Sequence, residues 1–524
     1  MSLATDPDIE LLDLPNELLA HIVSDTMPLG FESFVLSCKR LYAIAQERKL
    51  TEQHNSLIHA YQHVDFAGQE LDWSKEGTLP RLQCSLHLLL EIACQPVIAR
   101  YIDTAFLLPV SPTEEAMQNT LDADILDIGT CDAALRRFLP IRKSLKPPAD
   151  IKPTSRLQTV AHGASSRADV VWASSWRIAL ISLMTNVSKL AIPHQWLHPS
   201  TSHSTALLDA LATEAARPAG GALSNITEVE IWGLTDDPTP FQQLNIFLAL
   251  PRIRRLWCGQ ATGTENPERY WPVEWCCPAS ASQLECLEFF WCVISHFELK
   301  KMLARTPKLR RFRMHKAAVV SEMQTWNVGW VVQALQDYCG GTLTEITISI
   351  ECHADVITGY MCDFIGFKVL ERLELDTRCF CAPPRAAAAD APDASAVSLP
   401  PRLADMLPAT IKTVRLLTGT HDSQTFLLNG LFSRWHIDDC ESGTQRRVLP
   451  SLQMVDVLRG SVTVGGVPVD EGQDEEAWAA ARRVIEAAGC SYSDVPHASP
   501  EWVEKSRAGL LDYWCVVREI EADA

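Results

Sequence analysis

The sequence lacks the short motifs that mark the most common catalytic and nucleotide-binding sites. It contains no G-x-x-x-x-G-K-[ST] loop, no G-x-G-x-x-G turn, no H-E-x-x-H pair and no G-x-S-x-G elbow. Glycine-loop phosphate binding, zinc-protease chemistry and serine-hydrolase chemistry are therefore not indicated. We expect a protein that is not an enzyme and that carries no cofactor. A hydrolase of an unrecognised type is the alternative that these absences leave open.

Positive charge is also scarce. The chain has 46 Lys and Arg against 65 Asp and Glu, which gives a net charge of −19 and a pI of about 5.3. Because an acidic protein is repelled by a polyanion, we expect no nucleic acid and no anionic membrane among its partners.

Signals for secretion and for membrane insertion are missing as well. The N-terminus MSLATDPDIE has neither the basic region nor the apolar region of a signal peptide, and no apolar run reaches the roughly 18 residues that span a bilayer. The 17 Cys are scattered and form no C-x-x-C pair. We therefore expect a cytoplasmic or nuclear protein whose thiols stay reduced and mostly buried.

The most informative residue order lies between Leu11 and Tyr42, in LLDLPNELLAHIVSDTMPLGFESFVLSCKRLY. Leu14-Pro15 predicts a turn, followed by one helix from Glu17 and a second from about Phe31. Two short helices with this much Leu, Val and Phe cannot bury all of it between themselves. We therefore expect this stretch to offer an apolar surface to a partner.

This stretch resembles the F-box, the adaptor-binding motif of SCF-type ubiquitin ligases. The family pattern L-P-x-E-L-L-x-x-I is matched without a gap from Leu14 to Ile22, and the closing C-[KR]-R-[WLF] is matched from Cys38 to Leu41. The resemblance implies binding to an SKP-type adaptor and, through it, to a cullin–RING ligase. The alternative is an ordinary helical hairpin that docks on the rest of the chain. The residues that the resemblance assigns to the adaptor contact are Leu14, Pro15, Leu18, Leu19, Ile22, Leu36 and Leu41.

The rest of the chain contains an internal repeat of the form apolar-x-x-apolar-x-apolar. A short strand of this kind cannot bury its own apolar side chains, so successive units must stack on one another. Clear copies begin at Val187, Ile226, Ile253, Leu284, Leu309, Leu343, Leu370, Ile411 and Leu452, and a weaker one begins at Ile102.

These copies resemble leucine-rich repeats. The copy from Leu284 to Leu309 is similar to the Cys-containing class found behind F-boxes, with Cys292 at the loop position. The resemblance implies an α/β fold, with an N-terminal helical F-box domain at 9–60 and an irregular leucine-rich-repeat solenoid at 80–524. Most copies lack Asn or Cys at the loop position, so a smooth horseshoe is not expected. A conventional α/β domain with similar strand starts is the alternative.

Three further segments have a clear composition or periodicity. The Ala/Asp/Pro-rich stretch 385–401 is predicted to be a disordered insert, because it has almost nothing to bury. The Pro-, Lys- and Ser-rich stretch 140–166 is predicted to be a long loop. Apolar residues at helical spacing predict one helix from Leu82 to Arg100, and further helix is expected from Ala43 to Tyr61.

In the predicted strands, the residues between the inward apolar positions point to the opposite, concave face. Aromatic and Arg side chains gathered in one strip are typical of binding hot spots. The alternative is that loops cover the aromatic rings and that the charged side chains only pair across strands. The predicted target-binding residues are Trp232, Arg255, Trp257, Phe290, Arg311, Arg313 and His315.

A cysteine-rich region lies between Cys258 and His296, but its spacings fit no closed zinc site, and we expect no metal. With the two resemblances, the sequence is interpreted as a substrate-receptor subunit that holds an unknown target protein. Its length, irregular repeats and loops most resemble the large F-box sets of filamentous fungi. A non-catalytic leucine-rich-repeat scaffold or inhibitor, not linked to ubiquitin, is the alternative.

Overall fold

The computed structural model describes residues 11–66, 85–107, 180–194, 223–233, 239–263, 281–316, 327–350, 364–376, 406–418 and 449–459, with isolated residues at 215 and 221 and short pieces between 463 and 508. The chain forms two compact units. The first comprises Met1–Ala191, Arg217–Ile226 and Val516–Ala524, and the second Ile192–Ala216 and Thr227–Cys515. Within the described ranges, no helix has the length and apolar character needed to cross a membrane.

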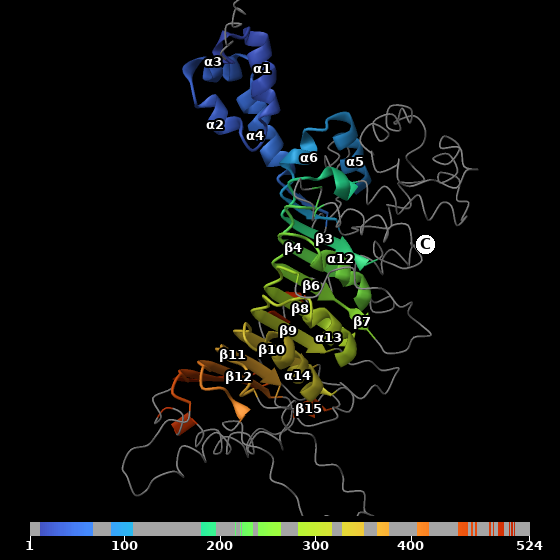
Figure 1. Ribbon diagram of the computed structural model, residues 1–524, viewed down its shortest axis with the longest axis vertical. Coiled ribbons are helices and arrows are strands. Elements are labelled where there is room, and N and C mark those ends of the chain that lie inside the picture. The colour runs from blue at the N-terminus through green and yellow to red at the C-terminus, as the bar shows by residue number, and fades with distance from the viewer. Residues whose placement is uncertain are drawn as a thin grey trace, which may run out of the picture. The chain divides into compact units, whose positions relative to one another are not determined.

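The first unit begins with short helices that pack on one another (Figure 1). Helix α1 packs against α2 and α3, and α4 packs against α3 and α6. Its core is formed by apolar residues at helical spacing, including Leu19, Val23, Phe31 and Leu41. The helical elements are η1 (Leu11–Asp13), α1 (Asn16–Asp25), α2 (Phe31–Val35), α3 (Lys39–Glu47), α4 (Leu50–Tyr61), α5 (Ser85–Cys94) and α6 (Ile98–Tyr101).

Three predicted helices are interrupted, each for a local reason. The helix expected from Phe31 ends at Val35, and α3 starts after an extended Cys38 whose sulfur accepts the amide of Leu41. The helix expected from Ala43 to Tyr61 is divided by Lys49, which has a φ of 54°. The helix expected from Leu82 to Arg100 breaks between α5 and α6, where Pro96 cannot donate the amide hydrogen bond of a continuous helix.

Three parallel strands follow these helices, and the first unit includes the last of them only as far as Ala191. Strand β1 (His63–Asp65) pairs with β2 (Thr104–Phe106), and β2 pairs with β3 (Lys189–Pro193). Ala105 pairs with Leu190, so the two earliest copies of the repeat motif occupy equivalent positions. Both side chains are buried.

The second unit is built on nine neighbouring parallel strands in the order β4-β6-β8-β9-β10-β11-β12-β13-β16. Strands that are consecutive in this order pair in parallel, so the chain must cross back between them. The bounds are β4 (Glu228–Trp232), β6 (Arg255–Gly259), β8 (Cys286–Ile294), β9 (Arg311–Lys316), β10 (Glu345–Ile350), β11 (Arg372–Asp376), β12 (Thr413–Thr418), β13 (Met454–Arg459) and β16 (Ser491–Pro496).

Shorter elements accompany these strands. Strand β5 (Thr239–Pro240) pairs with β7 (Ala261–Gly263), β7 also pairs with β8, and β14 (Thr463–Val464) forms an antiparallel pair with β15 (Val467–Pro468). The 3-10 helix η5 (Phe241–Leu244) leads into α12 (Asn245–Leu248). Helix α13 (His296–Leu303) is capped by Ser295, whose hydroxyl accepts the amide of Glu298, and α14 (Val328–Cys339) is capped by Asn327.

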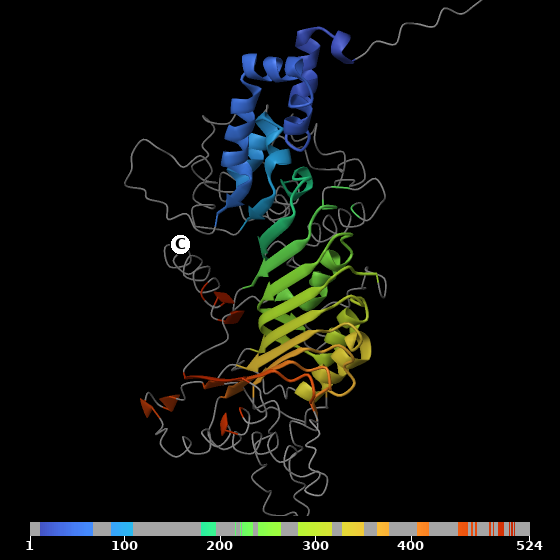
Figure 2. The ribbon, with the colours of Figure 1, turned by 90° about the vertical axis from the view of Figure 1, so that its left-hand side faces the viewer.

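Apolar side chains of the repeat motif align from strand to strand and form the core. Each strand contributes two alternating positions, and neighbouring copies meet in register. Helices α12, α13 and α14 lie along one face of these strands in both ribbon views (Figures 1 and 2). The aligned pairs are Val229 and Ile231, Leu256 and Cys258, Leu287 and Phe289, Phe312 and Met314, Ile346 and Ile348, Leu373 and Leu375, and Val414 and Leu416, and Val455 aligns with Val414.

Close backbone approach fixes the end of β4. The amide of Gly233 donates to the carbonyl of Gly259, and a Cβ at Gly233 would lie 2.6 Å from that oxygen. Only glycine allows this contact without movement of the backbone.

The predicted α/β class is confirmed, with helices and a parallel arrangement of strands. The predicted domain ranges 9–60 and 80–524 stay predictions. The insert predicted at 385–401 and the loop predicted at 140–166 lie outside the described residues.

Candidate binding surfaces

Exposed apolar side chains are concentrated in the N-terminal helices. Of the eleven large apolar residues that are exposed in the described part of the chain, six lie between residues 11 and 42. Soluble proteins usually cover apolar surface of this extent with a partner. The six are Leu11, Leu12, Leu18, Leu29, Leu36 and Tyr42.

The seven predicted adaptor residues separate into two groups. Leu18 and Leu36 have exposed fractions of 49% and 72%, Pro15 is exposed, and Leu14 and Ile22 are half-buried. Leu19 and Leu41 are buried in the core of the helices. The first five are therefore accessible to a partner, whereas the last two stabilise the helices that present them.

Arg40 fixes the segment that carries the leading leucines. Its guanidinium donates to the carbonyls of Leu12 and Leu14, the latter at 2.9 Å, and to Oδ1 of Asn16 at 2.7 Å. Sequence reasoning identified Arg40 only as part of the closing motif. These bonds show that it positions the turn before α1.

A buried polar pair joins α4 to α6 in the same unit. Nδ1 of His54 lies 2.8 Å from the hydroxyl oxygen of Tyr101, and the His54 ring also packs on Phe31 with centroids 4.5 Å apart. Burial raises the pKa of Tyr101 to about 12, so its hydroxyl stays protonated at neutral pH.

The His54 ring is expected to make the first unit less stable in acid. Burial lowers its pKa below the 6.5 of an ordinary ring, and the charge of Glu32 opposes this shift only in part. The unfolded chain therefore binds the proton at a higher pH than the folded chain. The stability that the neutral ring contributes is complete above pH 6.5 and is lost as the pH falls toward the folded pKa. Hydrogen-exchange protection factors of α4 should decrease between about pH 7.5 and about pH 5.5.

His54→Gln is the control for this pH dependence. Its side-chain amide retains a hydrogen-bonding group near Tyr101 but does not titrate, so the decrease in protection should be smaller. An equal decrease in the two chains would assign the pH dependence to other groups.

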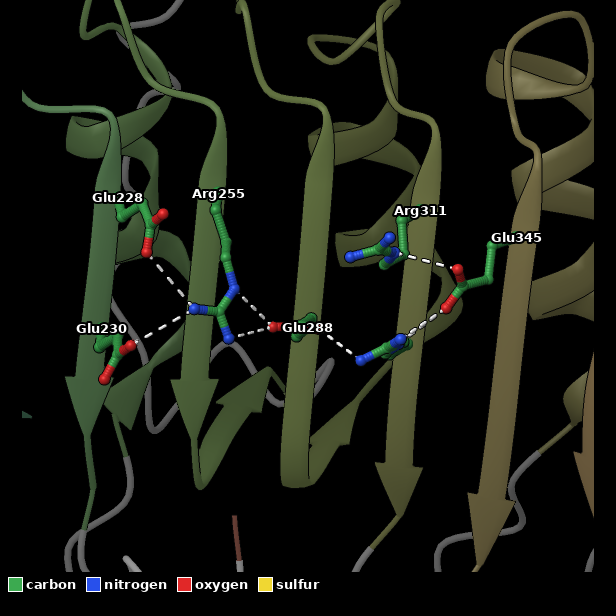
Figure 3. Close-up of polar contacts among 7 residues, drawn as sticks. Glu228, Glu230, Arg255, Glu288, Arg311 and Glu345 are labelled. Carbon is green, nitrogen blue, oxygen red and sulfur yellow. Dashed lines mark hydrogen bonds and ion pairs between the residues drawn. The ribbon is translucent and has the colours of Figure 1, made fainter. Parts of the chain in front are cut away.

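A network of ion pairs crosses the strand face of the second unit that bears the charged side chains (Figure 3). Arg255 lies 2.6 Å from Glu288, 3.4 Å from Glu230 and 3.5 Å from Glu228. Burial favours a lower pKa for Arg255, but the charge and hydrogen bond of Glu288 and the charge of Glu230 outweigh it and raise the pKa. Arg255 is thus a permanent cation between two acidic strands.

The same network continues over β9 and β10. Arg313 bridges Glu288 at 3.1 Å and Glu345 at 2.7 Å, and Arg311 donates to the other oxygen of Glu345 at 3.1 Å. Glu288 is almost fully buried, with 4% of its side chain exposed. It is therefore held by a cation on each side.

A second set of pairs lies on β11, β12 and β13. Arg415 contacts Glu374 at 3.3 Å and Asp456 at 3.1 Å. Burial raises the pKa of Glu374, although the charges of Arg415 and Arg313 oppose the rise. The alternation of charge along neighbouring strands stabilises their register.

The predicted target-binding residues differ in their access to solvent. Trp257, Phe290 and His315 are buried, Trp232, Arg255 and Arg313 are half-buried, and Arg311 is exposed. The ring of Trp257 packs on that of Trp232, with centroids 4.7 Å apart. A partner that approached this face would first meet charged side chains.

The described cysteines of the second unit serve packing. Sγ of Cys292 accepts the amide of Ala261 at 3.1 Å and lies 3.4 Å from the carbonyl oxygen of Cys258, which fixes the bulged end of β8. Burial raises the pKa of Cys258, Cys286 and Cys339, to about 12 for the last two, so none of these three is activated as a nucleophile. Within the described ranges, which exclude Cys276 and Cys277, no group of three or more His, Cys, Asp and Glu is arranged to hold a metal ion.

No protein-family model matches the sequence, and no curated protein matches it either.

Proposed function

We propose that this protein is a substrate-receptor subunit of an SCF-type cullin–RING ubiquitin ligase. Its N-terminal helices, as an F-box, bind the SKP-type adaptor, and its strand-rich unit, as an irregular leucine-rich-repeat solenoid, binds a target protein. Ubiquitin transfer is carried out by other subunits, so this chain needs no catalytic site or cofactor.

One observation carries the proposal. Leu18, in the L-P-x-E-L-L-x-x-I stretch, is exposed to solvent. Leu36, which follows α2, has a larger exposed fraction than Leu18. The core of these helices instead contains Leu19 and Leu41, which are fully buried. Leucines that a folded unit leaves outside its core, on a surface ordered by Arg40, are suited to anchor a partner.

Replacing both Leu18 and Leu36 by Asp is expected to abolish adaptor binding. Each buried Leu contributes roughly 1.5 kcal/mol or more, so the double variant should bind at least about a hundredfold more weakly. Because both side chains are exposed, the chain should keep its fold. The measurement is titration of the purified chain with an SKP-type adaptor, supported by circular dichroism.

Ile365→Asp is the matched control, because it introduces the same charge at an exposed apolar site, with 58% exposure, in the second unit. It should leave adaptor binding unchanged. Failure of the unaltered chain to bind an SKP-type adaptor would reject the proposal and favour a scaffold or inhibitor. Undiminished binding by the double variant would place the adaptor contact elsewhere.

A further inference from the structure

A tryptophan from near the C-terminus lies against the strand face of the second unit. The Trp502 ring meets Phe290 edge-on with centroids 6.4 Å apart, and meets His315 edge-on at 6.3 Å. The guanidinium carbon of Arg313 lies 6.0 Å from the centroid of the Trp502 ring. These three residues, from β8 and β9, define what we call the aromatic seat.

The three residues of the aromatic seat are held in place by contacts with one another and with neighbouring strands. Phe290 and His315 stack on each other at 5.2 Å, and Nδ1 of His315 lies 2.8 Å from Oγ of Ser349 on β10. Arg313 is fixed by Glu288 and Glu345. The residues of the aromatic seat are therefore ordered by contacts other than those with Trp502.

One polar group of Trp502, the indole N–H, makes no hydrogen bond within the described residues. Its indole Nε1 is buried and has no hydrogen-bond acceptor in the described part of the chain. A buried donor without an acceptor is unfavourable, which weakens this contact relative to a ligand that supplies one. Trp502 is thus held by ring contacts and by the cation of Arg313, but not by the hydrogen bond that a tight complex would add.

Charged side chains surround the aromatic seat and also flank Trp502 in the sequence. Arg311, two residues before Arg313 on β9, has 45% of its side chain exposed, and its charge reaches solvent. The occupying sequence itself, PEWVE at 500–504, places Glu on both sides of Trp502. Because Arg311 and Arg313 are both paired with Glu345, and Arg313 also with Glu288, the charges of this face largely balance, and the Trp ring is the feature that the aromatic seat recognises.

We propose that the aromatic seat binds a Trp side chain of the target protein, and that Trp502 occupies the seat until the target displaces it. The proposal deepens the proposed function, since it names the chemical class of the target. It also explains why aromatic side chains predicted to contact a target are covered in the free protein.

The test uses a fluorescein-labelled peptide with the sequence of residues 498–508, ASPEWVEKSRA. Fluorescence anisotropy would measure its binding to the unaltered full chain and to Trp502→Ala. Because the unaltered chain already fills the seat, the Trp502→Ala chain should bind the peptide at least tenfold more tightly. A peptide with Ala in place of its Trp should not bind. Hydrogen exchange with the peptide bound should show added protection in β8 and β9.

Trp502→Leu is a second variant that lacks the indole ring, for use if Trp502→Ala does not fold. Leu keeps apolar volume in the aromatic seat, so this variant should stay folded. Equal binding by all chains, binding by none of the folded chains, or protection away from β8 and β9 would overturn the proposal. The assay contains no adaptor, so its failure is distinct from a failure of the adaptor titration, which alone tests the link to ubiquitin ligation.

Discussion

Leu287→Ala is expected to lower the free energy of unfolding of the second unit by about 2–5 kcal/mol. Leu287 is fully buried on β8 and pairs in register with Leu256 on β6 and Phe312 on β9. Removing its side chain loses apolar burial and leaves a cavity between strands that are both fixed by backbone hydrogen bonds. Urea unfolding followed by tryptophan fluorescence would measure the change.

Ile365→Ala is the control for this prediction, because it removes apolar atoms from an exposed residue in the same unit. Its effect should stay within about 0.5 kcal/mol, as is usual for surface positions. If both variants unfolded at the same urea concentration, the assignment of Leu287 to the core would be wrong.

The strand positions of the second unit were predictable from the sequence because each copy of the motif carries its own signal. A two-residue alternation after a leading apolar residue marks Leu284, Leu287 and Phe289, and neighbouring copies pair in that register. Helix boundaries were less predictable. The breaks at Cys38 and Lys49 depend on local backbone geometry that apolar spacing does not record.

The candidate surfaces were only partly predictable, because exposure depends on segments distant in sequence. Strand alternation assigns the same face to Arg311 and Arg313, yet their side chains are 45% and 23% exposed. Phe290 was correctly placed on the face opposite the apolar core, but it is covered by Trp502, which lies 212 positions later (502 − 290). No pattern within a single strand could reveal that contact.

Arg313→Glu is expected to be among the most destabilising single substitutions on the strand face. It removes the cation between Glu288 and Glu345 and places a third carboxylate beside them, on the strand between their strands. Arg255 stays paired with Glu288 and Arg311 with Glu345, so the two original carboxylates each keep one cation and the new carboxylate has none. A charge without a partner in a largely buried ion-pair network costs about 3–5 kcal/mol, because it is desolvated and not compensated.

Arg311→Glu makes the same charge change two residues away and provides the comparison. Within the residues that the structure describes, Glu345 is the one ion-pair partner of Arg311, and nearly half of the Arg311 side chain reaches solvent, so water and salt screen the new charge. We expect its cost to stay near about 1 kcal/mol. Chemical denaturation of both variants gives the two free energies directly. Equal costs would mean that Glu288 is not the buried centre of the network, and a small cost for Arg313→Glu would show that strand register is held by the apolar core alone.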